Sequence, residues 1–195
     1  MNNSLLPRSL FGIESTFVEK FTGEIKELTS SSKLRTNEIK VLTNDKAGAA
    51  GRSKWFIVDR KVIKQNEKYI DEYQVVVSSA HAGGQDGRDN QLEIIDNKSA
   101  FGRARVALKS FKTKSEAQNF FEYASSRIIK YSFLMTDEAL SSVAKRVPDV
   151  LDYTNNNQLI DFSKDIDGQL AKLIGFTKSD LDYINSKIKN VKEME

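Results

Sequence analysis

The sequence contains no cysteine, only one histidine and only two prolines among its 195 residues. Without cysteine, disulfides, thiolate metal sites and cysteine nucleophiles are excluded. A single histidine, His81, excludes metal sites built from several histidines, and a histidine-dependent catalytic triad would have to use that residue. No matched pattern of serine and carboxylate accompanies His81, which argues against a role as general base.

Long apolar runs are missing as well. The N-terminus, MNNSLLPRSLFGIE, has no charged start followed by a long apolar core, and no stretch approaches 18 consecutive apolar residues. The sequence therefore predicts neither a secretion signal nor a membrane span. We expect a cytoplasmic protein without a membrane partner.

The remaining composition is that of a globular protein, with 39% apolar and 29% charged residues. The length allows one large domain, or one domain with a small appendage, around a sizeable core. The net charge of +3 is small, but its distribution is uneven. Residues 52–114 hold 13 basic and 8 acidic side chains, whereas residues 136–195 hold 8 basic and 11 acidic ones. The middle of the chain is basic and its C-terminal part is acidic.

The hydrophobic patterns predict an α+β fold, with a mixed or antiparallel sheet in residues 35–111, a long packed helix and a helical C-terminal tail. Three regions follow from this: an N-terminal helix and linker in 1–50, a sheet plus long helix in 51–135, and a helical subdomain in 136–195. The expected helices are 11–28, from Thr113 to about Ile129, 136–145, 166–174 closed by Gly175, and 177 onward. The valine-rich strand YQVVVS is expected to be covered on both faces.

The strand RARVALKSF carries the clearest charge pattern. Arg103, Arg105 and Lys109 alternate with apolar residues, which predicts one apolar face and one outward basic face. With Lys98, Lys112 and Lys114, residues 97–115 hold six basic and no acidic side chains. Six phosphate contacts to duplex DNA would give a salt slope of about −5. The alternative is a solvated face whose charges are paired with carboxylates elsewhere on the surface.

Two further places offer candidate nucleic-acid contacts. The loop HAGGQDGRDNQ contains His81, Gln85, Arg88 and Asn90, whose side chains can read base edges. The alternative, which the composition favours, is a mobile surface loop without such a role. The loop lacks the lysine of a phosphate-binding P-loop. Trp55, beside Lys54, could stack on or contact a nucleic acid, or could simply belong to the core.

Signatures of catalysis are weak. Glu24 to Lys26 and Glu38 to Lys40 each spell the E-x-K end of a nuclease motif, but the first aspartate of the chain is Asp45, after both of them. A self-standing, metal-dependent nuclease remains an alternative. We expect no enzymatic activity from this chain alone.

The order of four segments carries a family resemblance. KWFIVDRKVI, IDEYQVVVSSAHAGG, SAFGRARVALKSFKTKSEAQNFFEYASSRIIKYSFLM and VPDVLDYTNNNQLIDFSKDIDGQLAKLIGFTKSDLDYINSKI follow one another in residues 54–188. Over roughly residues 50–195 the chain resembles the C-terminal target recognition domain of adenine-specific DNA methyltransferases of type II restriction-modification systems. This family includes enzymes that fuse the methyltransferase to a nuclease.

The resemblance implies a module that selects a DNA sequence while a separate domain performs the chemistry. The parent enzyme would bind S-adenosylmethionine and, where it includes a nuclease, Mg, but this chain is expected to bind no cofactor. With only Pro7 and Pro148, an N-P-P-Y methyltransferase motif cannot be present. Expected partners are double-stranded DNA and a methyltransferase or nuclease catalytic domain in the same or another chain.

The resemblance and the residue patterns together give one set of expected DNA contacts. Gly83, Gly84 and the loop to Asn90 would face DNA, as would Arg103 and Arg105, while lysines would hold phosphates. The full set is Lys54, Trp55, Arg60, His81, Gly83, Gly84, Gln85, Arg88, Asn90, Arg103, Arg105, Lys109, Lys112 and Lys114. The alternative is a protein-interaction subunit of a restriction-modification complex, which would dock through the Phe17/Phe21 segment and the C-terminal helices without touching DNA.

Overall fold

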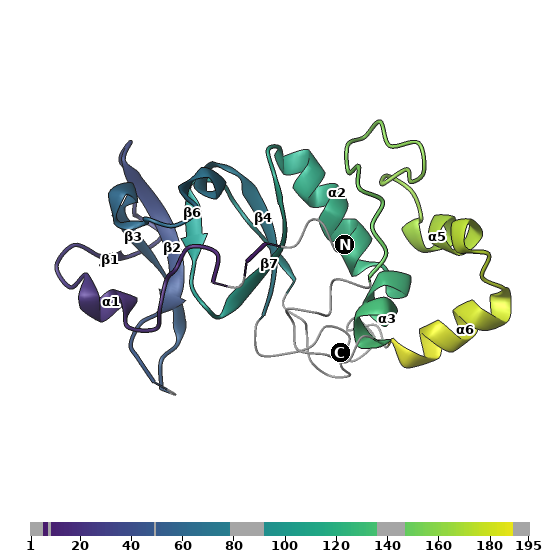
Figure 1. The fold of residues 1–195 in the computed structure, drawn as a ribbon, viewed down its shortest axis with the longest axis horizontal. Helices are drawn as coiled ribbons and strands as arrows, with labels where there is room; N and C mark the ends of the chain where they lie inside the picture. Colours follow the sequence, from purple (N-terminus) through teal and green to yellow (C-terminus); the bar gives the residue numbers. More distant parts are fainter. Residues whose placement is uncertain (1–5, 8, 49, 79–91, 136–146, 189–195) are drawn as a thin grey trace.

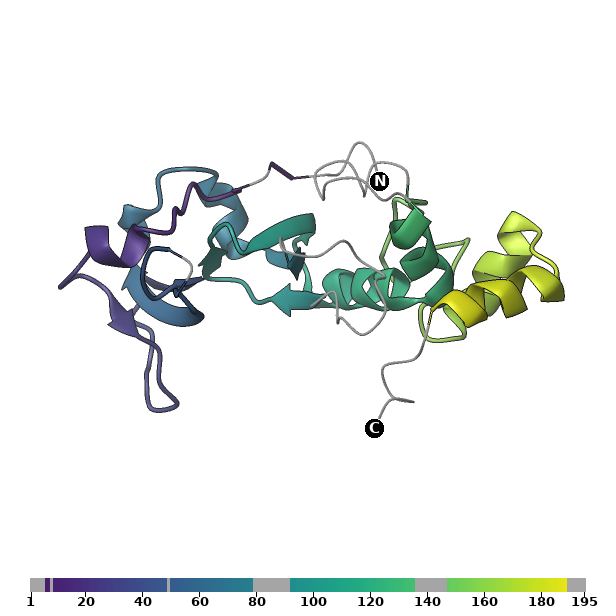
Figure 2. The same cartoon turned by 90° about the horizontal axis from the view of Figure 1, so that it is seen from below.

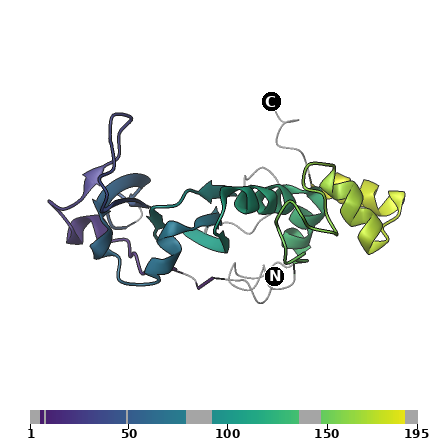
Figure 3. The same cartoon turned by 90° about the horizontal axis from the view of Figure 1, so that it is seen from above.

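A computed structural model describes residues 6–7, 9–48, 50–78, 92–135 and 147–188, and the statements below concern these residues. The elements lie in a row along the longest axis (Figure 1). A sheet with a short helix occupies one end, a second sheet the middle, and the C-terminal helices the other end. Figures 2 and 3, turned by 90° about this axis, show the same succession. The predicted α+β class and the helical tail are confirmed, but the strands form two sheets rather than one.

The first sheet has the strand order β1-β3-β2-β6. Its strands are β1 (Lys26–Glu27), β2 (Glu38–Asn44), β3 (Ser53–Asp59) and β6 (Ser99–Phe101). All pairs are antiparallel except β2 with β6, so the sheet is mixed. Two short 3-10 helices, η2 (Arg60–Val62) and η3 (Glu67–Asp71), connect β3 to the second sheet.

The second sheet is antiparallel and has the order β5-β4-β7. It consists of β4 (Tyr73–Ser78), β5 (Glu93–Ile95) and β7 (Arg105–Phe111). The prediction that the valine-rich strand is covered on both faces is confirmed, because Val75, Val76 and Val77 are all buried. Val75 and Val77 pack in the core under the helices, whereas Val76 packs in the core shared with the first sheet. Strand β4 therefore joins the two cores.

The predicted long helix is broken in two. The structure has α2 (Lys114–Ser125) and α3 (Arg127–Met135), with Ser126 in an extended conformation between them. The carboxylate of Asp167 accepts hydrogen bonds from the backbone N–H groups of Arg127 and Ile128, at 3.0 and 2.9 Å. These bonds satisfy donors that a helix start leaves free. The break thus depends on a residue about 40 positions further along the chain, which local periodicity could not reveal.

The predicted N-terminal helix over 11–28 is wrong in extent. Only α1 (Phe17–Lys20) is helical, and the chain then turns at Gly23, which has φ +90°, into β1. The apolar residues are still inside: Phe11, Ile13 and Phe17 are buried in the core of the first sheet. Their spacing reflects a segment packed on that sheet rather than one continuous helix. The helix expected at 136–145 lies outside the described residues.

The two C-terminal helices follow the prediction closely. They are α5 (Ile166–Ile174), which ends at Gly175 with φ +83°, and α6 (Lys178–Lys187). Thr177 and Asp180 form the predicted capping box, in which each side chain accepts a hydrogen bond from the backbone N–H of the other residue. None of the helices in the described ranges is long and apolar enough to cross a membrane.

The capping box gives the first testable expectation. Thr177→Ala removes the acceptor for the N–H of Asp180 and should lower the free energy of unfolding by about 1 kcal/mol. Urea denaturation measures this difference. Ser179→Ala, two residues further inside α6, serves as the control and should cost less than half as much. Equal losses in the two variants would mean that the cap contributes nothing specific.

Candidate nucleic-acid interface

The predicted outward basic face of β7 is not present. Lys109 is buried, and its Nζ lies 2.8 Å from Oδ1 of Asp149. The side chains of the two residues are only 8% and 6% exposed. Lys109 also lies over the rings of Tyr153 and Phe120, at 4.6 and 5.7 Å from their centroids. The expectation that Lys109 contacts DNA phosphates from the surface is therefore wrong.

A bulge in the strand pairing explains this error. Val75 pairs with Lys109, but the next residue of β4, Val76, pairs with Ala107, so Leu108 is an extra residue in β7. Beyond a bulge, the alternation of side chains between the faces changes by one position. Lys109 consequently shares the helix-covered face of the sheet with Val75, while Arg105 belongs to the other face. Strict alternation in the sequence had placed the two on one face.

Asp149 is the acceptor that makes the burial of Lys109 tolerable. Besides Lys109, its Oδ1 accepts hydrogen bonds from the hydroxyl of Tyr153 at 2.8 Å and from the N–H of Leu151 at 3.0 Å. Burial by itself would raise the pKa of Asp149, but these three hydrogen bonds outweigh it and lower the pKa below its ordinary value. The carboxylate is thus held ionised opposite the lysine. This ion pair links β7 to the segment that leads to α5.

Arg103 and Arg105 lie together at the beginning of β7. Arg105 pairs with Ser78, the last residue of β4, and its Nε donates to the carboxylate of Glu93, the first residue of β5. Arg103 lies just before the strand and donates from Nη1 to Oε2 of Glu14 at 3.2 Å. We call this end of the second sheet, with its two arginines and two glutamates, the arginine end. It is the end where β4 stops and β5 starts.

The other predicted cations are distributed over the molecule. Lys54, on β3, lies 3.2 Å from Glu27 and 3.7 Å from Asp45. Lys114, at the start of α2, lies 3.6 Å from Asp96. Lys112 is exposed, and the described part of the chain offers it no ion pair. These residues belong to different elements, so they do not form the single row that the sequence suggested.

Arg60 and Trp55 have structural partners. Arg60 makes two parallel hydrogen bonds to Asp71, at 2.6 and 2.7 Å, which connect η2 to η3. These bonds raise the pKa of Arg60 and lower that of Asp71. Trp55 is half-buried against the core of the first sheet, and Nζ of Lys40 lies 5.7 Å from its ring. The interpretation of Trp55 as a core residue is favoured.

Exposure separates the ion pairs that a phosphate could replace from those it could not. An exposed pair contributes about 0–1 kcal/mol, so little is lost when its cation turns to a different anion. Arg103 and Glu14 are 63% and 59% exposed, and Lys114 and Asp96 are 67% and 50% exposed. Lys54 is 41% exposed. These cations, with Lys112, remain available to a phosphate backbone, whereas Lys109 does not.

The predicted DNA contacts His81, Gly83, Gly84, Gln85, Arg88 and Asn90 lie outside the described residues.

Within the described ranges, no group of three or more His, Cys, Asp or Glu residues is arranged to hold a metal ion. The glutamate of one E-x-K segment, Glu38, accepts a hydrogen bond from the backbone N–H of Arg35 at 2.8 Å.

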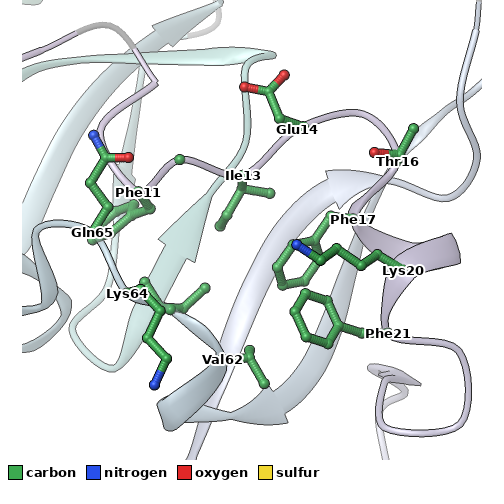
Figure 4. Close-up of a pocket in the computed structure, with 12 residues that line it drawn as sticks. Phe11, Ile13, Glu14, Thr16, Phe17, Lys20, Phe21, Val62, Lys64 and Gln65 are labelled. Carbon is green, nitrogen blue, oxygen red and sulfur yellow. The ribbon is translucent and has the colours of Figure 1, made fainter.

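The structure also contains a pocket that the sequence did not suggest. It has a volume of about 250 Å³ and lies between the segment 11–21 and the segment 62–65 (Figure 4). Phe11, Ile13, Phe17, Phe21, Val62 and Ile63 give it an apolar lining, and Glu14, Thr16, Lys20, Lys64 and Gln65 add polar groups. We call it the N-terminal pocket. The sequence did not predict this pocket, because the pattern of residues 11–28 indicates one continuous helix and a single helix does not enclose a cavity.

Comparison with known proteins adds no relative. No protein-family model, no curated protein and no solved structure matches the chain.

Proposed function

We propose that the chain is a sequence-specific DNA-binding module, the target recognition part of an adenine-specific DNA methyltransferase or restriction-modification enzyme, and acts without a catalytic centre of its own. The proposal begins from the order of the sequence segments and from the glycine-containing sequence that follows β4. One structural observation supports it most: Arg103 and Arg105 lie at the same end of the second sheet as Ser78 and Glu93, and the sequence 79–91 runs between these two residues.

The arginine end has the properties that a DNA contact needs. Arg105 is only 15% exposed and is held by Glu93, so the expectation that it faces DNA is wrong. Arg103, which is 63% exposed, is the arginine of this end that a DNA strand can reach. Arginine is suited to both phosphates and guanine edges because its donors form a planar fork. The base-reading role proposed for Gln85, Arg88 and Asn90 comes from the sequence alone.

The solvent exposure of each cation revises the set of phosphate contacts that the sequence predicted. Arg103, Lys112 and Lys114 are exposed cations near the two ends of β7, and Lys54 is a further candidate on β3. Lys109 and Arg60 are removed from the set, because the first is buried and the second is held by Asp71. Four phosphate contacts would give a salt slope of about −3.6, shallower than the six contacts of the sequence-based expectation.

Fluorescence anisotropy with a labelled duplex between 50 and 200 mM salt tests the proposal. Arg103→Gln should weaken binding to all sequences and make the salt slope shallower by about one. Lys172→Gln changes the charge equally but lies in α5, among the C-terminal helices at one end of the row of elements and away from the second sheet, and should leave binding unchanged (Figure 1). Arg88→Ala should relax the preference at one base pair. Absence of duplex binding at 50 mM salt would refute the proposal.

One observation favours the alternative of a subunit that docks a catalytic domain without touching DNA. The C-terminal helices and the segment before them expose large apolar side chains: Leu151, Leu159, Leu173, Ile174 and Tyr183, each at least 46% exposed. Exposed apolar surface of this kind is typical of protein contacts. The anisotropy experiment separates the two functions, because this alternative predicts no duplex binding at any salt concentration.

A further inference from the structure

The N-terminal pocket combines apolar and cationic groups in a small volume. Phe17 and Phe21, from segment 11–21, lie against each other with ring centroids 4.8 Å apart, and Val62 lines the pocket from the segment 62–65 (Figure 4). Lys64 and Gln65 come from this second segment as well. Pockets for drug-sized ligands usually measure about 300–1,000 Å³. At about 250 Å³, this pocket has room for one small planar group with a polar substituent.

The charge at the rim of the pocket is positive. Among the described residues of its lining, Glu14 is the one carboxylate, and it pairs with Arg103 at 3.2 Å. Lys20 and Lys64 are exposed and make no ion pair within the described residues. Nζ of Lys20 lies 5.7 Å from the ring centroid of Phe21, so the positive charge of Lys20 is next to the aromatic part of the lining. A ligand that fits this arrangement is flat and carries a negative charge.

The pocket is also connected to the proposed DNA contact. Glu14 belongs to its lining, and the partner of Glu14 is Arg103 of the arginine end. A DNA strand whose phosphate is held by Arg103 would therefore pass the mouth of the pocket. Thr16 and Gln65 supply a hydroxyl and an amide, which can pair with the polar edge of a base.

We propose that the N-terminal pocket binds a single unstacked nucleotide, with its base against Phe21 and Val62 and its phosphate near Lys20 and Lys64. This inference rests on the proposed DNA-binding function when the nucleotide belongs to a DNA strand, but a free mononucleotide has the same chemistry. Stacking on an aromatic side chain stabilises any of the bases, and the two amines at the rim favour the phosphate. In a regularly stacked duplex no base is free to enter the pocket. The pocket therefore prefers DNA that contains an unpaired nucleotide over fully paired duplex DNA.

Two measurements on the full chain test this site. The first is a ¹H–¹⁵N NMR titration with dAMP, in which the amides of Lys20, Phe21 and Val62 should shift. The second is the affinity for a duplex with one bulged nucleotide relative to the fully paired duplex, which should be at least fivefold higher. Lys64→Gln should remove this advantage and leave binding to the paired duplex unchanged. Lys172→Gln is the control and should retain the advantage.

The outcomes separate this inference from the proposed function. Shifts with dAMP but no preference for the bulged duplex would support a site for a free mononucleotide. Shifts with dAMP and no binding to any duplex would support the pocket while refuting the DNA-binding function. Binding to the paired duplex with neither shifts nor a preference for the bulge would overturn the pocket alone. The pocket would also be overturned if a short peptide with adjacent Asp and Phe shifted these amides and dAMP did not.

Discussion

Lys109→Ala should destabilise the protein by about 3–5 kcal/mol, because it leaves the carboxylate of Asp149 buried without its cation. The alanine also removes the contacts of the lysine stem with the rings of Phe120 and Tyr153. Urea denaturation at pH 7, monitored by circular dichroism, measures the loss. Lys112→Ala, three residues away but exposed, should stay within about 0.5 kcal/mol of the original protein.

The pH dependence identifies the cause of this loss. The pKa of Asp149 lies below its ordinary value of 3.8, because hydrogen bonds from Lys109, Leu151 and Tyr153 outweigh the effect of burial. Its contribution to stability is therefore present above that value and is lost as the pH falls through the folded-state pKa. Without Lys109, burial should dominate and raise this pKa. The deficit of Lys109→Ala should then shrink between pH 7 and pH 4.

A double substitution provides the matched control for Lys109→Ala. Lys109→Met with Asp149→Asn removes both charges but keeps an acceptor for the N–H of Leu151 and the hydroxyl of Tyr153. Replacing a buried ion pair as a whole is often nearly neutral, so the double variant should recover part of the lost stability. A single Lys109→Ala variant as stable as Lys112→Ala would show that the ion pair is not essential.

Local sequence patterns predicted those features that depend on neighbouring residues. The capping box at Thr177, the left-handed Gly175 and the buried valines of β4 each follow from a few adjacent residues, and each is confirmed. The mixed arrangement of the first sheet could not be derived in this way. It depends on the parallel pairing of β2 with β6, whose residues, such as Val41 and Ala100, are almost 60 positions apart.

The charged residues show why the candidate site was harder to predict than the fold. Residues 97–115 contain no acidic residue, yet carboxylates outside this window pair with its cations: Asp96 lies directly before it, and others lie far away in the chain. Asp149 is 40 positions from Lys109, and Glu14 is 89 positions from Arg103. The partners of an ion pair are brought together by the fold and not by their spacing in the sequence. The solvent exposure of the cation then decides whether it is available to another anion. A bulge of one residue was enough to move Lys109 to the buried face.

The ion pair and the pocket lie in different cores. Tyr153, over whose ring Lys109 lies, belongs to the cluster under the helices, whereas Phe11 and Phe17 belong to the cluster of the first sheet. Substitutions in one cluster should therefore leave the other intact, provided that β4 still joins them. This separation is useful, because variants that test DNA contacts at the N-terminal pocket need not disturb the ion pair.

Tyr153→Ala should cost about 3–5 kcal/mol, the typical loss for removing a large buried aromatic side chain. Tyr153 is 2% exposed, and its ring lies within 6 Å of the rings of Phe111, Phe120, Tyr123 and Phe162. Its hydroxyl donates to Asp149 at 2.8 Å. The side chain thus fixes the described segment 147–165, which leads to α5, on β7 and α2.

Two companion variants separate packing from hydrogen bonding at Tyr153. Tyr153→Phe keeps the ring and loses only the bond to Asp149, which should cost about 1.5–3 kcal/mol because the acceptor is charged. Tyr183→Ala removes a tyrosine of α6 that is 55% exposed, and it should cost less than either. Thermal and urea denaturation give the three values on one scale. If Tyr153→Ala were no worse than Tyr183→Ala, the segment would not be held by this ring, and the burial of the Lys109–Asp149 pair beside it would lose its explanation.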